Sequence, residues 1–177
     1  MSKRRHKQQL KGFGQRQKTT ASRPAQPASR IGRGTSASAY YMCPFDELFP
    51  EQAAQEYGML RVVQQDGTLV DDYTVIEYIC SNPACDCHKM LLDVVAHSSH
   101  QSMALIDLDL RRFSGVHLSD DKSHSPFAHT LLALLAQNKL SEPAYQTGLK
   151  AHYRQFKQAV RNPTADQATV LGRYRDG

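Results

Sequence analysis

Three cysteines lie within one short segment, Cys80-Ser81-Asn82-Pro83-Ala84-Cys85-Asp86-Cys87. The segment separates two runs rich in β-branched and apolar residues, 74–80 and 90–96, a composition typical of strands. The Asn-Pro pair in its middle favours a turn. The sequence therefore predicts two antiparallel strands whose connection brings three thiols together.

Two further segments carry strand signals. Residues 59–63 are followed by Gln64-Gln65-Asp66-Gly67, which is typical of a hairpin turn. Residues 103–110 alternate, with Ala104, Ile106, Leu108 and Leu110 on one face and Asp107 and Asp109 on the other. Four such segments predict an antiparallel β-meander with one buried face.

The period then changes from strand to helix. Ser125-Pro126 is a helix-start signal, and an apolar stripe follows it to about Lys139. Ser141-Glu142-Pro143 begins a second amphipathic stretch, which Asn162-Pro163 ends. We therefore expect an α+β fold in which the meander, with its cysteine zinc knuckle, precedes a C-terminal helical hairpin.

The chain is divided by charge. Residues 1–45 contain ten Lys or Arg and no acid, whereas the rest contains twelve Lys or Arg and all seventeen acids. Residues 1–39 offer few side chains that could pack, so we expect a disordered basic tail. The predicted domain spans 40–162, and 163–177 are predicted to be a flexible C-terminal tail.

No apolar run approaches the roughly 18 residues that cross a bilayer, so no membrane partner is expected. The start, Met1-Ser2-Lys3-Arg4, lacks the hydrophobic segment of a secretory signal. A transit peptide is an alternative interpretation of this Arg- and Ser-rich segment. The expected location is the cytoplasm, where thiols stay reduced.

Thiols in a reducing compartment indicate metal or redox chemistry. Zinc prefers thiolates in a tetrahedral arrangement, so Cys80, Cys85 and Cys87 are predicted zinc ligands. Cys43 is the first choice for the fourth ligand and His88 the second; His97 and His100 are remoter choices. The alternatives are a redox pair formed by Cys85 and Cys87, and inert buried thiols.

The Cys80–Cys87 stretch resembles the C-x-N-P-x-C-D-C segment of some small bacterial proteins of unknown function. It is also partly similar to the SEC-C zinc motif, in which a CxC pair precedes further Cys or His ligands. Cys85 and Cys87 match that pair, and His97 lies near the position of a later ligand, although no downstream cysteine follows. The resemblance implies a bound metal and does not imply a particular function.

The cations suggest a nucleic-acid partner. A flexible basic segment can neutralise phosphates and release counterions. A stripe of four cations also follows one side of the last predicted helix. The candidate contacts are Lys3, Arg4, Arg5, Lys7, Lys11, Arg16 and Lys18 in the tail, and Lys150, Arg154, Lys157 and Arg161 on the helix.

These patterns predict a non-enzymatic zinc-binding module that associates with RNA or a ribonucleoprotein. A zinc-stabilised protein–protein adaptor, whose tail only aids solubility, is the alternative. A metal-dependent nucleic-acid hydrolase comes third: its metal would use Asp107 and Asp109, with Glu77 and Asp93 nearby in the sheet. It ranks below the others because strand alternation places Asp107 and Asp109 towards solvent. The sequence contains no recognisable nucleophile arrangement or phosphate-binding loop.

Overall fold

The computed structural model describes residues 42–63, 67, 69–113, 115–120 and 124–174. All of them belong to one compact unit, which spans residues 31–177. The predicted tail, residues 1–39, lies outside the described residues. No described helix is both long and apolar enough to cross a membrane.

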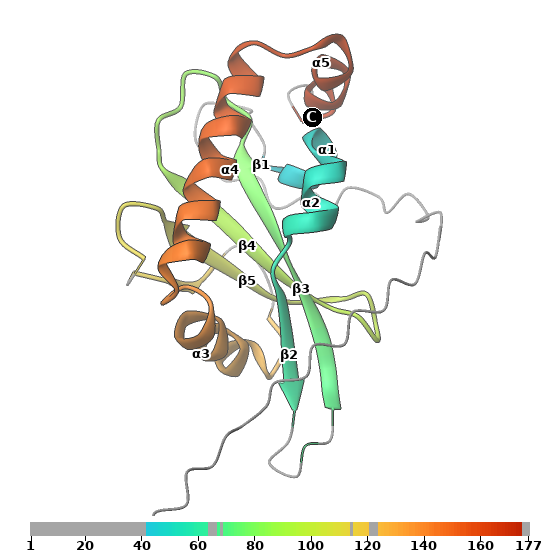
Figure 1. The fold of residues 1–177 in the computed structure, drawn as a ribbon, viewed down its shortest axis with the longest axis vertical. Helices are drawn as coiled ribbons and strands as arrows, with labels where there is room; N and C mark the ends of the chain where they lie inside the picture. Colours follow the sequence, from blue (N-terminus) through green and yellow to red (C-terminus); the bar gives the residue numbers. More distant parts are fainter. Residues whose placement is uncertain (1–41, 64–66, 68, 114, 121–123, 175–177) are drawn as a thin grey trace, which may run out of the picture. The chain divides into compact units, whose positions relative to one another are not determined.

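A six-stranded antiparallel sheet forms the centre of this unit (Figure 1). Strands β3, β4, β5 and β6 follow one another across the sheet, while β1 and β2 both pair with β3. The strands are β1 (Met42–Pro44), β2 (Met59–Val63), β3 (Leu69–Cys80), β4 (Lys89–Ala96), β5 (Ser102–Asp109) and β6 (His117–Leu118). The predicted meander is therefore confirmed.

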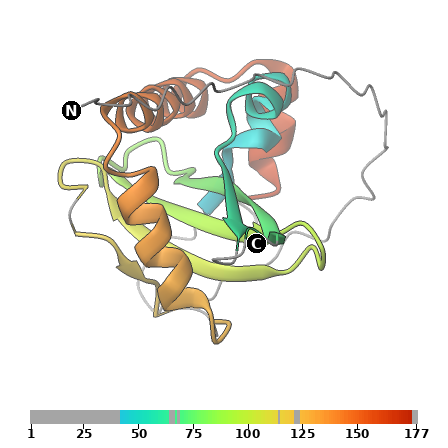
Figure 2. The ribbon, with the colours of Figure 1, turned by 60° about the horizontal axis from the view of Figure 1, so that its bottom comes forward.

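The described residues also form five helices: α1 (Phe45–Leu48), α2 (Pro50–Glu56), α3 (Ala128–Asn138), α4 (Pro143–Arg161) and α5 (Ala165–Gly172). The two predicted C-terminal helices correspond to α3 and α4, and α4 lies over one face of the sheet (Figure 2). Alternation places Ile79, Leu92 and Ile106 on the face that packs against Leu135 and Phe156 of the helices. This shared core fixes where the side chains of α4 meet the sheet.

The C-terminal segment differs from the prediction of a flexible tail. Thr164 and Gln167 form a reciprocal capping box at the start of α5. Leu171 is 0% exposed, and Tyr174 is also buried in the core cluster. The ordered unit therefore continues through residue 174, because a capped short helix can bury two large apolar side chains.

Candidate functional site

The predicted turn between β3 and β4 is present. The Ala84 N–H donates a hydrogen bond of 2.9 Å to the Asn82 side chain, and the Cys85 N–H donates one of 3.2 Å to the Asn82 carbonyl. Asn followed by Pro favours this geometry, because the Asn side chain can accept from the backbone two residues later. The turn reverses the chain so that residues 80, 85 and 87 come close together.

The three thiols of this loop interact with one another. Cys80, Cys85 and Cys87 are free and partly buried. A hydrogen bond with Cys80 is the main cause that lowers the pKa of Cys87 to about 5, and the Lys157 charge contributes in the same direction. The same hydrogen bond, together with burial, raises the pKa of Cys80. The contact between these two sulfurs thus favours the thiolate at Cys87 and the thiol at Cys80.

Cys43, the first choice for the fourth ligand, lies elsewhere. In the pairing of β1 with β3, Cys43 is opposite Ile79, and Met42 is opposite Cys80. Directly paired residues share one face of a sheet, and neighbours along a strand alternate. Cys43 is 0% exposed within the hydrophobic core, and burial raises its pKa. This arrangement corrects the assignment, because Cys43 and Cys80 project from opposite faces.

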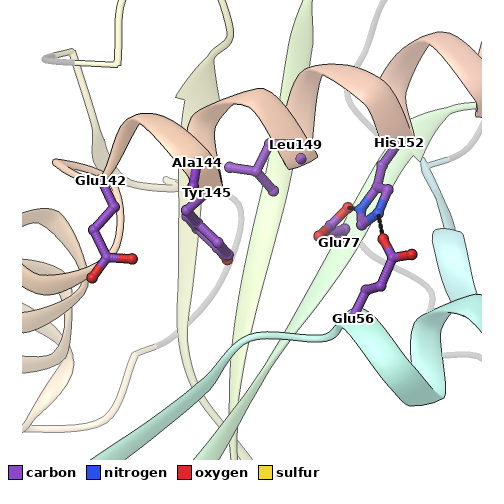
Figure 3. Close-up of a pocket in the computed structure, with 8 residues that line it drawn as sticks. Glu56, Glu77, Glu142, Ala144, Tyr145, Leu149 and His152 are labelled. Atoms are coloured by element: carbon purple, nitrogen blue, oxygen red, sulfur yellow. Dashed lines mark hydrogen bonds and ion pairs between the residues drawn. The ribbon is translucent and has the colours of Figure 1, made fainter.

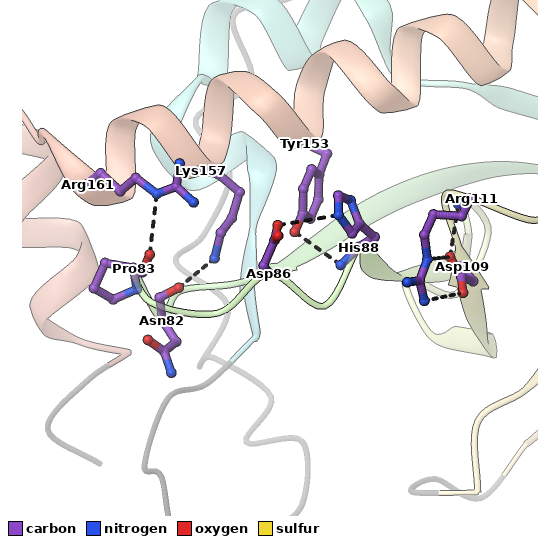
Figure 4. Close-up of polar contacts among 9 residues, drawn as sticks. All are labelled: Asn82, Pro83, Asp86, His88, Asp109, Arg111, Tyr153, Lys157 and Arg161. Carbon is purple, nitrogen blue, oxygen red and sulfur yellow. Dashed lines mark hydrogen bonds and ion pairs between the residues drawn. The ribbon is translucent and has the colours of Figure 1, made fainter.

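His88 remains beside the loop (Figure 4). Its backbone has a left-handed φ of 52°, its N–H donates to the Tyr153 hydroxyl over 3.2 Å, and its ring stacks on Tyr153. The imidazole Nε2 is 3.4 Å from a carboxylate oxygen of Asp86. Of the remoter choices, His97 is hydrogen-bonded to Thr74 instead. Among the described residues, no three His, Cys, Asp or Glu side chains already stand where they could hold a metal ion.

Helix α4 holds the thiol loop with its cations (Figure 4). Lys157 is only 4% exposed, and its ammonium donates to the carbonyls of Cys80, at 3.2 Å, and Asn82, at 2.5 Å. Arg161 donates to the Pro83 carbonyl at 3.3 Å. Lys157 is therefore engaged inside the fold, which corrects its assignment to a phosphate-binding stripe.

The other two cations of the stripe are exposed. The Lys150 ammonium lies 5.1 Å from the centre of the Phe113 ring, and Arg154 donates to the carbonyl of Lys150 one turn earlier. The predicted contacts at Lys3, Arg4, Arg5, Lys7, Lys11, Arg16 and Lys18 lie outside the described residues.

The acids on β5 have local partners. Asp109 forms a bidentate ion pair with Arg111, with distances of 3.1 and 2.9 Å. Asp107 lies 3.7 Å from His117 on β6. The third alternative was a hydrolytic metal centre on this strand. Among the described residues, no group of three possible metal ligands comes together there.

A second polar cluster joins α2, β3 and α4 (Figure 3). The His152 ring is 2.8 Å from Glu77 through Nδ1 and 2.7 Å from Glu56 through Nε2. It also stacks on the Phe45 ring, with centroids 4.4 Å apart. Glu77 is 1% exposed, whereas the Glu56 side chain is 50% exposed. One imidazole thus links a buried carboxylate with a solvated one.

The environment separates the protonation behaviour of these groups. Burial raises the pKa of Glu77, whereas the hydrogen bond from His152 lowers the pKa of Glu56. Burial disfavours the imidazolium, but the hydrogen bonds and charges of both carboxylates outweigh it and raise the pKa of His152. The two carboxylates therefore favour the charged form of His152, while the burial of Glu77 disfavours its own ionised form.

The cluster lines a cavity of about 230 Å³. Its other walls come from the N-terminal half of α4, and the full lining is Glu56, Glu77, Glu142, Ala144, Tyr145, Gly148, Leu149 and His152. Two sequence signals indicate this site in retrospect. Glu77 occupies the apolar phase of β3 between Val75 and Ile79, and a polar residue at a core position of a strand is unusual. His152 similarly follows Leu149 on the buried side of α4.

No family model, curated protein or solved structure matches this chain. The function is therefore argued from the two sites themselves.

Proposed function

We propose that the protein is a non-enzymatic zinc-binding module that associates with RNA or a ribonucleoprotein through the basic residues preceding its domain. The observation that carries the zinc assignment is the placement of Cys80, Cys85 and Cys87 in one short loop that the Asn82 turn closes between β3 and β4. Thiolates are the ligands that zinc prefers. The proposal therefore assigns the ion to these three sulfurs.

The surroundings of the loop suit such a site. Three thiolates bring a charge of about −3, which exceeds the charge of one Zn²⁺, and Lys157 and Arg161 lie against the loop to offset the excess. The turn at Asn82 closes the loop that carries all three thiols, and binding requires them to move together from their present positions. We assign the fourth position to His88, whose ring must turn away from Asp86.

Elemental analysis of purified protein tests the metal and its ligands together. One zinc per chain is expected in the wild type, and Cys85→Ser or Cys87→Ser should lose it. Cys43→Ser is the matched control and should keep full occupancy, because Cys43 lies on the other face of the sheet. A folded, metal-free wild type would refute zinc binding, whereas zinc loss in Cys43→Ser would refute only the ligand set.

A structural zinc stabilises the folded chain, because its ligands assemble only on folding. Adding a strong chelator should therefore lower the melting temperature of the wild type and leave that of Cys85→Ser nearly unchanged. Unchanged melting of a zinc-loaded wild type would contradict a structural role.

The lowered pKa of Cys87 specifically favours a second candidate, thiol redox chemistry. In that case air oxidation of metal-free protein should form a Cys80–Cys87 or Cys85–Cys87 disulfide that is readily reduced. Mass spectrometry of alkylated peptides distinguishes the two functions. Thiols that bound zinc shields from alkylation and oxidation favour the first function. A reversible disulfide that forms in the protein as purified, with its zinc content unchanged, favours the second.

The RNA part of the proposal rests on ten cations without an acid in residues 1–45. If about five of them contact single-stranded RNA, log affinity should fall against log salt with a slope near −3.5. Deleting residues 1–39 should remove most of this slope without affecting zinc content. Filter binding at several salt concentrations measures both effects.

Two sets of cation variants on α4, one exposed and one buried, can be compared in the same assay. Lys150→Ala with Arg154→Ala should weaken RNA binding slightly, because both side chains are exposed. Lys157→Ala should not alter the salt slope, since its ammonium is bound to loop carbonyls. Equal RNA binding with and without the tail would move the protein–protein adaptor into first place.

A further inference from the structure

We propose that the cavity between α2, β3 and α4 is a binding site for a linear polyamine. This site is separate from the thiol loop and uses none of the zinc ligands. It is built from Glu56, Glu77, Glu142 and His152, with Tyr145 and Leu149 between the charged ends (Figure 3).

The charge of the lining selects a cation. Three lining residues are carboxylates, and His152 is the only lining residue that can become positive. Even with His152 protonated and paired with Glu77, the exposed carboxylates of Glu56 and Glu142 leave the wall negative, and negative charge in a partly buried site is stabilised by a bound counter-charge. Neither Lys nor Arg lines the cavity in the part of the chain that the structure describes.

The placement of the charges selects an elongated ligand. Figure 3 shows Glu142 at one end of the cavity and the Glu56–His152–Glu77 cluster at the other. Ten residues of helix between positions 142 and 152 span about 15 Å, and the long glutamate side chains shorten the gap. Two ammonium groups joined by flexible alkyl segments match this separation, whereas a single metal ion does not.

The middle of the cavity suits the alkyl segments. Leu149 and the ring of Tyr145 form an apolar wall between the two acidic ends, and an aromatic face also attracts an ammonium group. The volume of about 230 Å³ equals roughly eight waters at about 30 Å³ each. A slender chain fits this space better than a ring system with several substituents.

Isothermal titration of the full-length, RNA-free protein with spermidine tests the proposal. We expect one site per chain, with weaker binding of 1,4-diaminobutane, because the shorter diamine cannot reach both acidic ends. Glu142→Gln and Glu56→Gln should each lower spermidine affinity by about five- to tenfold, which corresponds to about 1 to 1.4 kcal/mol. Both side chains are exposed, so these variants should fold.

Glu51→Gln is the matched control. It removes the same charge from an exposed position on α2 outside the cavity, and the affinity should stay within about twofold of wild type. Absence of spermidine binding, or equal losses in Glu51→Gln and Glu142→Gln, would overturn the proposal. Equal competition by Mg²⁺ at the same charge concentration would also overturn it, since that would indicate a diffuse ion atmosphere.

Discussion

Helix α4 contacts two polar regions that are built in opposite ways. Towards its C-terminal end, Lys157 and Arg161 supply cations to the carbonyls of the thiol loop. Closer to its N-terminus, His152 lies between the carboxylates of Glu56 and Glu77. The loop is a local structure closed by its own turn, whereas the acidic cluster exists only when α2, β3 and α4 are packed together.

This difference has an energetic consequence. A local loop keeps its turn when one outside contact is removed, because its hydrogen bonds come from neighbouring residues. A buried charged cluster loses more stability when one partner is removed, because another group is then left desolvated and unpaired. The following predictions test whether the two regions differ in this way.

The largest effect is expected for Glu77→Ala. Glu77 is buried, and its loss leaves the Nδ1 side of His152 without its partner. Breaking a buried ion pair of this kind costs about 3 to 5 kcal/mol, measured as the free energy of unfolding in urea. Glu56→Ala is the control and should cost about 1 kcal/mol or less, because its side chain is half-exposed. Similar losses in both variants would contradict the distinction between the buried and solvated carboxylates.

A smaller loss is expected for Lys157→Met, on the side of the thiol loop. The substitution keeps the alkyl stem but leaves the carbonyls of Cys80 and Asn82 without their charged donor. Hydrogen bonds to a charged group contribute about 1.5 to 3 kcal/mol, which sets the expected decrease in unfolding free energy. Arg154→Met, exposed on the same helix, should change it by about 0.5 kcal/mol at most. A neutral Lys157→Met would mean that the turn holds the loop alone.

The same division between local and assembled features explains what the sequence could predict. Strand 59–63 and the helices starting near Pro126 and Pro143 were predictable, because periodicity and capping signals are local. The α5 helix was missed although Thr164 and Gln167 carry its capping signal. The short strand β1 has no periodicity of its own, and its pairing with β3 decides its conformation.

The candidate sites follow this pattern as well. Clustering of Cys80, Cys85 and Cys87 is visible in sequence because the loop itself gathers them. The face of the sheet on which Cys43 lies depends on the register between β1 and β3, and a slip of one residue would move its side chain to the other face. His152 was hidden because a histidine within an apolar helix face resembles an ordinary core position, and its carboxylate partners are 75 and 96 residues away.

A pH titration should reveal the acidic cluster as a modest decline in stability. The folded-state pKa of His152 is raised above its ordinary value of 6.5. Its charged form therefore stabilises the fold fully below about pH 6.5, and this contribution is lost as pH rises through the folded pKa. We expect the unfolding free energy to fall by about 1 kcal/mol, comparable to one hydrogen bond, between mildly acidic and alkaline pH.

Two variants separate this effect from other titrations. His152→Gln should flatten the decline, whereas His129→Gln, which alters an exposed histidine on α3, should leave it intact. The lowered pKa of Glu56 acts in a different window, because its stabilisation is present above about pH 4.5 and lost as pH falls further. An unchanged decline in His152→Gln would show that the imidazole remains neutral in the fold.

The smallest effect is expected for Tyr145→Phe, within the cavity wall. The Tyr145 hydroxyl is buried and is the one such side-chain oxygen or nitrogen without a hydrogen-bond partner among the described residues. It lies close to Gly58, where an added Cβ would stand 3.1 Å from the oxygen. A buried hydroxyl that makes no hydrogen bond carries a desolvation penalty of about 1 to 3 kcal/mol, and replacing it with hydrogen keeps the ring. Because the neighbouring space can relax, we expect a gain of up to about 1 kcal/mol in unfolding free energy, measured in urea. A loss of similar size would instead show that solvent in the cavity hydrogen-bonds to this hydroxyl. The polar groups of the acidic cavity would then all have hydrogen-bond partners, as the carbonyls of Cys80 and Asn82 in the thiol loop do.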